Sequence, residues 1–261
     1  MSDFYDAEVY DARAQGVPGD VEFFLKLALE AHALGHPVLE LACGTGRVAI
    51  PIAQAGVRVV GLDLRPSMLA VAQAKSDGLD VKNARWVEGD MRDFALPERF
   101  GLIYIPFRSF QHLLTVEDQL ACLAAVREHL TPGGRFALNI FNPNIIAIAE
   151  GISSQRGSLR RRRDDYTNTR SGGTMKAWET RAYHTAAQEV ESDWIDEELD
   201  NDGVVVSRVY RGLKLRYLFR YEMEHLLIRA GFEIEALYGD CFGAPFEDTS
   251  PEMVWVATKP A

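Results

Sequence analysis

An apolar run that stops at two glycines constrains the fold of this chain most. Residues 38–42 read Val-Leu-Glu-Leu-Ala, then Gly44 and Gly46 follow, and a helical pattern begins within residues 46–55. A strand that ends in a glycine turn and enters a helix brings unpaired backbone N–H groups close to a ligand. We therefore expect a small polar ligand at this turn.

Strand and helix patterns continue to alternate after this turn, which predicts a parallel sheet with helices on both faces. Asp20 is expected to cap the first helix. Two late strands have no helix between them and predict an antiparallel pair at the sheet edge. The predicted helices are 21–34, 46–55, 66–75, 116–130 and 221–230, and the predicted strands are 37–42, 57–62, 84–88, 101–105, 134–141, 233–238 and 252–258.

A change of composition predicts an insertion. Residues 160–163 are four arginines followed by two aspartates, which favours a solvated connection over a site for an anionic partner. Residues 174–219 are rich in strand formers, and the turn signal Asn-Asp-Gly at 201–203 predicts an antiparallel sheet. The expected organisation is a lid segment over 1–19, an α/β core over 20–150, a β insertion over 151–219 and the rest of the core over 220–261.

Composition disfavours several function classes. The formal net charge of −10 argues against a general DNA or RNA surface, because phosphate binding needs clustered lysine and arginine. No apolar segment approaches the roughly 20 residues of a membrane span, and the amino terminus lacks a signal-peptide pattern. Cys43, Cys122 and Cys241 have no metal-ligand spacing. We expect a cytoplasmic monomer or homodimer without structural metal, nucleic acid or membrane partner.

Acidic residues on neighbouring strands indicate what the ligand contains. Asp63 ends the second apolar run, about 20 residues after the turn, where a carboxylate can accept both hydroxyls of a ribose. The glycines with Asp63 also fit a dinucleotide fingerprint, so these residues leave NAD open. Glu40 lies inside the first strand, where negative charge favours a sulfonium or ammonium group over a pyrophosphate. The two acids together favour a nucleoside ligand that carries positive charge.

The chain resembles the class I methyltransferases that use S-adenosylmethionine. Their first motif corresponds to residues 40–46, their second-strand acid to Asp63, their third motif to Gly89-Asp90-Met91, and the turn before their fifth strand to residues 131–135. The resemblance covers residues 20–142 and resumes near the carboxyl terminus. It implies an α/β fold, a doubly wound seven-stranded Rossmann-like sheet, with the antiparallel β-sheet inserted.

The same resemblance implies S-adenosylmethionine as cofactor and S-adenosylhomocysteine as product. The third motif is expected to offer a carboxylate to the adenine amino group and a thioether to the adenine face. The cofactor-binding residues that we predict are Glu40, Ala42, Gly44, Thr45, Gly46, Asp63, Leu64, Met68, Gly89, Asp90, Met91, Pro106 and Phe107.

Within that class the chain is similar to small-molecule methyltransferases, including the aminosugar N-methyltransferases. In the latter a histidine follows the fourth strand beside the acceptor, and residues 106–113 match that segment, which implies a catalytic role for His112. A histidine is suited to take the proton of an amine or hydroxyl near neutral pH. Tyr5 and Tyr10 are expected to add polar groups from a lid over the cofactor.

Other interpretations stay open. Asp90 can cap a short helix, Met91 and Phe107 can pack in the core, and His112 can be structural. An NAD-dependent oxidoreductase is the alternative enzyme, and a cofactor-binding protein without catalysis is the alternative from another class. We predict methyl transfer from S-adenosylmethionine to nitrogen or oxygen of a small-molecule acceptor.

Overall fold

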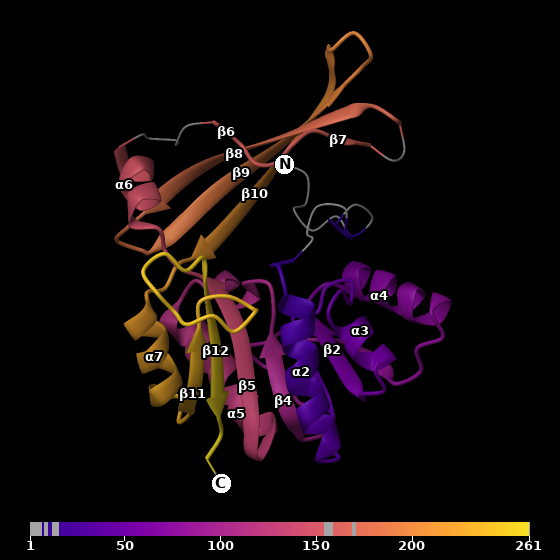
Figure 1. The fold of residues 1–261 in the computed structure, drawn as a ribbon, viewed down its shortest axis with the longest axis vertical. Coiled ribbons are helices and arrows are strands. Elements are labelled where there is room, and N and C mark those ends of the chain that lie inside the picture. Colours follow the sequence, from indigo (N-terminus) through magenta and orange to yellow (C-terminus); the bar gives the residue numbers. More distant parts are fainter. Residues whose placement is uncertain (1–6, 8–9, 12–15, 154–158, 169–170, 261) are drawn as a thin grey trace. The chain divides into compact units, whose positions relative to one another are not determined.

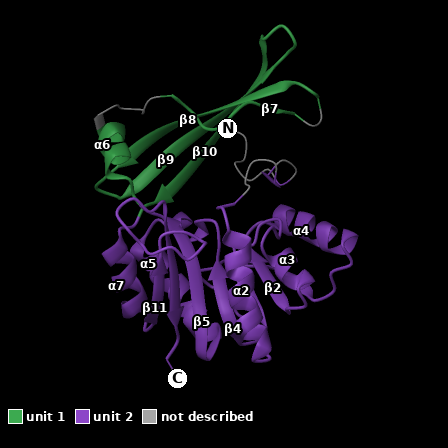
Figure 2. Ribbon diagram, in the orientation of Figure 1, with its two compact units in different colours: residues 1–6, 143–217 green, residues 7–142, 218–261 purple. Residues whose placement is uncertain are grey.

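The computed structural model divides the chain into two compact units (Figure 1). One unit combines residues 7–142 with 218–261, and the other consists of residues 143–217 (Figure 2). The chain therefore leaves the first unit once and returns to it. The residues that the structure describes are 7, 10–11, 16–153, 159–168 and 171–260.

The larger unit is built on one seven-stranded sheet in the order β11-β12-β5-β4-β1-β2-β3. Strands β1 to β5 run parallel to one another, whereas β12 is antiparallel to both β5 and β11. This confirms the predicted α/β fold class. The strands are β1 (Val38–Leu41), β2 (Val59–Asp63), β3 (Ala84–Glu88), β4 (Phe100–Ile105), β5 (Leu130–Phe141), β11 (Glu233–Tyr238) and β12 (Glu252–Thr258).

Successive side chains of the central strands enter two different hydrophobic clusters, because strand side chains alternate between the faces of a sheet. Val38 packs with α2 (Asp20–Ala33) and α3 (Ala49–Gln54). Its neighbour Leu39 packs with α5 (Val116–His129) and α7 (Arg220–Arg229). Helix α4 (Pro66–Gly78) follows β2, and the short 3-10 helix η1 (Ser109–His112) precedes α5. Both faces of the sheet are thus covered by helices, and the carboxyl ends of β1, β2 and β4 meet at one edge.

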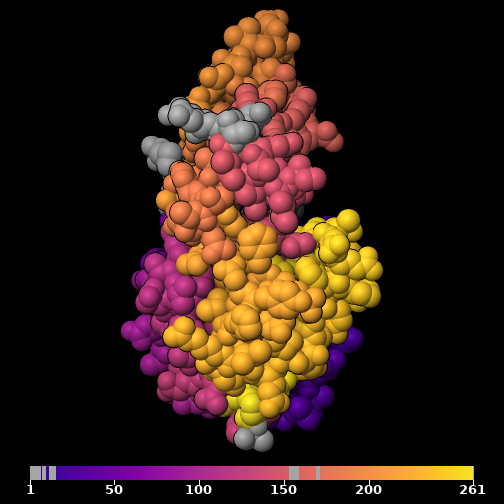
Figure 3. All heavy atoms as spheres, turned by 90° about the vertical axis from the view of Figure 1, so that its left-hand side faces the viewer, coloured from indigo at the N-terminus to yellow at the C-terminus, as the bar shows by residue number. Residues whose placement is uncertain are grey.

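In the space-filling view, α7 and the carboxyl-terminal residues, in orange-gold to yellow, cover one side of this unit (Figure 3). No helix among the described residues is long and apolar enough to cross a membrane.

Asp20 does not cap α2 as predicted. The N-cap is Gly19, and Asp20 is the first helical residue, only 2% exposed. Its carboxylate accepts the N–H of Val17 over 3.0 Å and binds the guanidinium of Arg47, with Oδ1 2.8 Å from Nη1. The prediction was wrong because Arg47, beside the glycine turn, takes this carboxylate as its partner. Asp20 thereby ties α2 to that turn.

The smaller unit contains the predicted antiparallel sheet. Strands β8 (Thr174–His184), β9 (Glu189–Leu199) and β10 (Val205–Arg216) form its three long strands. The turn between β9 and β10 has Gly203 at φ 79°, a left-handed conformation that glycine adopts without steric cost. The sheet is completed by β6 (Arg160–Arg161) beside β8 and by β7 (Tyr166–Thr167), and helix α6 (Ile145–Ser153) precedes them.

The arginine run is not a simple solvated connection. Arg161 does pair with Asp165, as expected from the local aspartates, but Arg160 binds Glu150 at 2.5 Å. Arg162 lies 3.9 Å from the centre of the Trp194 ring, and its side chain is only 12% exposed. The expectation failed because the guanidinium can stack on an aromatic side chain of the sheet, which a local charge count does not reveal.

Candidate active site

The glycine turn after β1 is held by the carboxylate of Asp63 at the end of β2. The N–H of Gly44 donates to Oδ2 over 2.8 Å, and the N–H of Arg65 donates to Oδ1 over 2.9 Å. Burial raises the pKa of Asp63, and these backbone N–H groups oppose that rise. Gly46 has φ 78°, and a Cβ there would lie 2.8 Å from the ring of Trp86. The residues predicted from spacing are therefore brought together, and glycine is required at the turn.

Glu40 is a buried acid beside this turn, 2% exposed. Its Oε2 accepts the hydroxyl of Tyr104 over 3.0 Å. Burial raises the pKa of Glu40 to about 8, while the hydrogen bond from Tyr104 and the positive charge of Arg47 oppose the rise. A cation bound next to this carboxyl would lower its pKa and restore its negative charge. The geometry therefore suits a positively charged ligand.

Tyr10 and Asp11 lie against the glycine turn. A Cβ placed on Gly44 would lie 3.9 Å from Cε1 of Tyr10. Burial raises the pKa of the Tyr10 phenol to about 12. The hydroxyl of Thr45 donates to Asp11, and Asp11 pairs with Lys75 at 2.5 Å. The Nζ of Lys75 also donates to the carbonyl of Thr45 over 3.1 Å. These contacts agree with a covering role for Tyr10, which stays a prediction.

The other predicted lid residue, Tyr5, lies outside the described residues.

Four further side chains that were predicted to bind the cofactor differ in their surroundings. Leu64 is 63% exposed, whereas Met68 is 1% exposed and packs within the fold. Asp90 accepts the N–H of Arg92 over 2.9 Å and pairs with its guanidinium at 2.6 Å, which lowers the pKa of Asp90. Met91 is partly buried against the core. The sequence left open a purely local role for Asp90, and its interaction with Arg92 is of this kind. Contact between Asp90 and adenine therefore remains a prediction.

A strained turn follows β4. Phe107 and Arg108 have φ values of 54° and 65°, a left-handed conformation that costs a residue with a side chain about 1–2 kcal/mol. The guanidinium of Arg47 lies 5.4 Å from the centre of the Phe107 ring. Beyond the turn, η1 ends at His112. Burial and the positive charge of Arg65 lower the pKa of His112 to about 4. The imidazole is therefore neutral at pH 7.

Behind this turn lies a buried polar network that sequence reasoning missed. Phe107 donates its N–H to Asn139 over 2.8 Å, and Asn139 donates to Glu252 over 3.0 Å. Arg108 donates from Nε to the other oxygen of Glu252 over 2.9 Å. Asn139 and Glu252 are 0% and 1% exposed. The signal in the sequence was weak: Asn139 interrupts one apolar strand run, and Glu252 directly precedes another.

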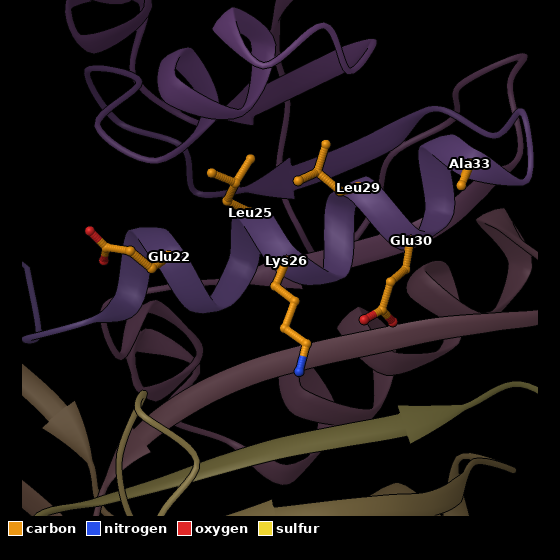
Figure 4. Close-up of a pocket in the computed structure, with 6 residues that line it drawn as sticks. All are labelled: Glu22, Leu25, Lys26, Leu29, Glu30 and Ala33. Carbon is orange, nitrogen blue, oxygen red and sulfur yellow. The ribbon is translucent and has the colours of Figure 1, made fainter.

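One surface depression of this unit lies away from the residues of this site. Among the described residues, no group of three or more His, Cys, Asp or Glu side chains is arranged to hold a metal ion. A depression elsewhere on the unit is formed by one helix, α2, and contains none of the residues discussed above (Figure 4). Its lining consists of Glu22, Leu25, Lys26, Leu29, Glu30 and Ala33.

Comparisons with known proteins agree with this geometry. Residues 38–134 match the family model of the methyltransferase domain. The solved structure of the CcbJ methyltransferase from Streptomyces caelestis is similar over 99% of both chains, with a TM-score of 0.83 and 26% identity. Residues 38–134 are therefore a methyltransferase domain, and the chain has the Rossmann-like methyltransferase fold. The turn held by Asp63 lies within these matched residues.

Curated relatives match the chain over part of its length. A cypemycin N-terminal methyltransferase from Streptomyces is 34% identical over 42% of this chain and 43% of that protein. The dTDP-3-amino-3,4,6-trideoxy-alpha-D-glucopyranose N,N-dimethyltransferase of Streptomyces venezuelae is 30% identical over 49% of this chain and 54% of that protein. The chain spans about half the length of the curated relatives that it matches.

Proposed function

We propose that this methyltransferase transfers a methyl group from S-adenosylmethionine to nitrogen or oxygen of a small-molecule acceptor. The observation that carries the proposal is the pairing of Asp63 with the glycine turn, next to buried Glu40. A carboxylate has about four lone-pair positions, and the two N–H groups on Asp63 leave positions for ribose hydroxyls. The negative charge of Glu40 favours a ligand with a sulfonium and an ammonium group and disfavours the pyrophosphate of NAD.

The residues on the acceptor side suit the remaining chemistry. When bound, S-adenosylmethionine supplies a methyl group on a positively charged sulfur, so the protein must orient the nucleophile and exclude water. The neutral imidazole of His112 can accept the N–H or O–H of the acceptor. Its lowered pKa makes it a weak base, so we assign it mainly to orienting the nucleophile and holding its proton during transfer.

The relatives' named substrates support a small molecule with an amine or hydroxyl as the acceptor. One relative is named as the N-terminal methyltransferase of cypemycin, and another as the N,N-dimethyltransferase of a dTDP-linked amino sugar. A ubiquinone biosynthesis O-methyltransferase is 32% identical over 53% of this chain. Since these acceptors differ in the atom methylated, we propose both nitrogen and oxygen for this chain.

Calorimetric titration with S-adenosylmethionine, S-adenosylhomocysteine and NADH in parallel tests the proposal. We expect micromolar binding of the first two and none of NADH, followed by turnover in a screen of amines, aminosugars and phenols. Binding of NADH alone would overturn the assignment. Tight cofactor binding without turnover on any acceptor would support the non-catalytic alternative.

Asp63→Ala is expected to weaken binding of S-adenosylmethionine at least tenfold, or about 1.4 kcal/mol. The variant removes the ribose acceptor and also releases the N–H of Gly44. Calorimetry measures the affinity, and thermal unfolding shows whether the protein stays folded. Asp77→Ala is the matched control. The exposed carboxylate of Asp77 accepts a hydrogen bond from Gln73 on the same helix, α4. Equal affinity of D63A and the wild type would rule out the ribose contact.

A further inference from the structure

The turn after β4 adopts a conformation that its own residues disfavour. Phe107 and Arg108 are consecutive left-handed residues, and neither is glycine, asparagine or aspartate. Such strained backbone persists where the surrounding structure imposes it, and it is concentrated at functional sites. Some other part of the molecule must therefore hold this turn in place.

One carboxylate holds both residues of the turn. Glu252, at the start of β12, accepts Nε of Arg108 over 2.9 Å, and Nη2 of Arg108 donates to the same oxygen. Its other oxygen accepts Nδ2 of Asn139 over 3.0 Å, and Oδ1 of Asn139 accepts the N–H of Phe107 over 2.8 Å. The carboxylate is buried, which makes charge-assisted hydrogen bonds stronger than they are in water. Asn139 and Glu252 thus connect β5 and β12 to the backbone of the turn.

The position of this turn decides where two parts of the site lie. The Phe107 ring lies against Arg47, which follows the glycine turn. After Arg108 the chain enters η1, and His112 is the last residue of this helix. A shift of the turn would therefore move the imidazole relative to the cofactor-binding residues, and misplacement by about 1 Å can lower a rate about 100-fold.

We propose that Glu252 is a positioning residue, whose carboxylate holds the strained Phe107–Arg108 turn and thereby fixes His112 for methyl transfer. This inference rests on the proposed function, because it gives the turn a role on the acceptor side of a methyltransferase site. Glu252 itself acts through Asn139 and Arg108, and its role is to set a backbone conformation.

The test compares Glu252→Gln with the double variant Arg108→Gly/Glu252→Gln. In E252Q the turn loses the charge that balances Arg108, so we expect kcat to fall at least tenfold while the affinity for S-adenosylmethionine changes less than threefold. In the double variant the unpaired guanidinium is gone and glycine adopts φ 65° without strain. We expect its kcat to recover to within threefold of the wild type. A double variant as slow as E252Q would overturn the proposal.

Hydrogen exchange measured by mass spectrometry gives a readout that does not need turnover. We expect peptides covering residues 106–113 to exchange at least tenfold faster in E252Q and at a rate near that of the wild type in the double variant. Asn139→Ala, which releases the N–H of Phe107, is expected to speed exchange in the same peptides. Unchanged exchange in both E252Q and N139A would also overturn the proposal.

Glu235→Gln is the matched control. Glu235 on β11 meets Arg135 of β5 at 3.6 Å and the hydroxyl of Thr258 of β12 at 3.2 Å, toward the ends of β5 and β12 opposite to Asn139 and Glu252. We expect kcat and exchange at residues 106–113 to stay unchanged in E235Q. If the wild type neither binds S-adenosylmethionine nor transfers methyl, the proposed function fails, while the exchange rates still decide whether Glu252 holds the turn.

Discussion

Replacement of His112 by glutamine is expected to lower turnover about 100-fold while the affinity for S-adenosylmethionine stays within threefold. The imidazole lies at the end of η1, where we propose that the acceptor binds, and its pKa, lowered by burial to about 4, leaves it neutral at pH 7. Glutamine can accept a hydrogen bond from the acceptor but cannot take its proton, so H112Q separates these two roles. Steady-state kinetics with the acceptor found by screening measures kcat, and calorimetry measures cofactor affinity.

The pH profile provides the control for this prediction. Because the pKa of His112 is lowered to about 4, ionisation of His112 is expected to leave kcat/KM of the free enzyme unaffected above pH 5. Exposed His225 on α7 is the comparison, and H225Q is expected to be as active as the wild type. A loss of activity near pH 6.5 that disappears in H112Q would contradict the lowered pKa. Full activity of H112Q would remove the proton-accepting role of His112 and leave only the orienting role.

The parallel core could be predicted from the sequence because its strands carry their own signal. The central strands β1 and β2 are buried along their whole length and read as nearly continuous apolar runs. The edge strands β3 and β11 have the predicted bounds of 84–88 and 233–238. The predicted antiparallel pair also forms, but the strand that pairs with β5 is β12, which leaves β11 at the edge. The order of the last two strands depends on packing across the sheet, which no local pattern records.

Part of the candidate site could be predicted from the sequence, and part could not. Asp63 and the glycine turn follow from spacing, because adjacent parallel strands bring their carboxyl ends together. Arg108 and Glu252 are 144 positions apart, and Asn139 and Glu252 are 113 positions apart. Such distant partners leave no periodic pattern in the chain. The buried position of Arg162 could not be predicted either, because its stacking partner Trp194 lies on another strand.

The second large effect is expected at Glu40. Glu40→Gln should stabilise the cofactor-free protein by on the order of 3 kcal/mol at pH 9 and leave its stability unchanged at pH 4. Burial raises the pKa of this carboxyl from about 4.5 to about 8, so the folded state keeps a proton that the unfolded state loses between these values. Stability of the wild type therefore falls as pH rises from 4.5 to 8, and the neutral amide removes that cost. Urea unfolding at several pH values measures the difference.

The same substitution should weaken binding of S-adenosylmethionine at least tenfold at pH 8, because the amide offers no charge to its cationic groups. In the wild type, those cationic groups lower the pKa of Glu40, so binding of S-adenosylmethionine should release a proton near pH 7. Calorimetry in buffers of different ionisation enthalpy detects this proton release. Tyr104→Phe is the matched control: it removes the hydrogen bond to Glu40 but keeps the carboxyl, so proton release should persist. Equal proton release by E40Q and the wild type would assign it to another group. If E40Q is more stable yet binds more weakly, the buried acid is retained for ligand binding at the expense of stability.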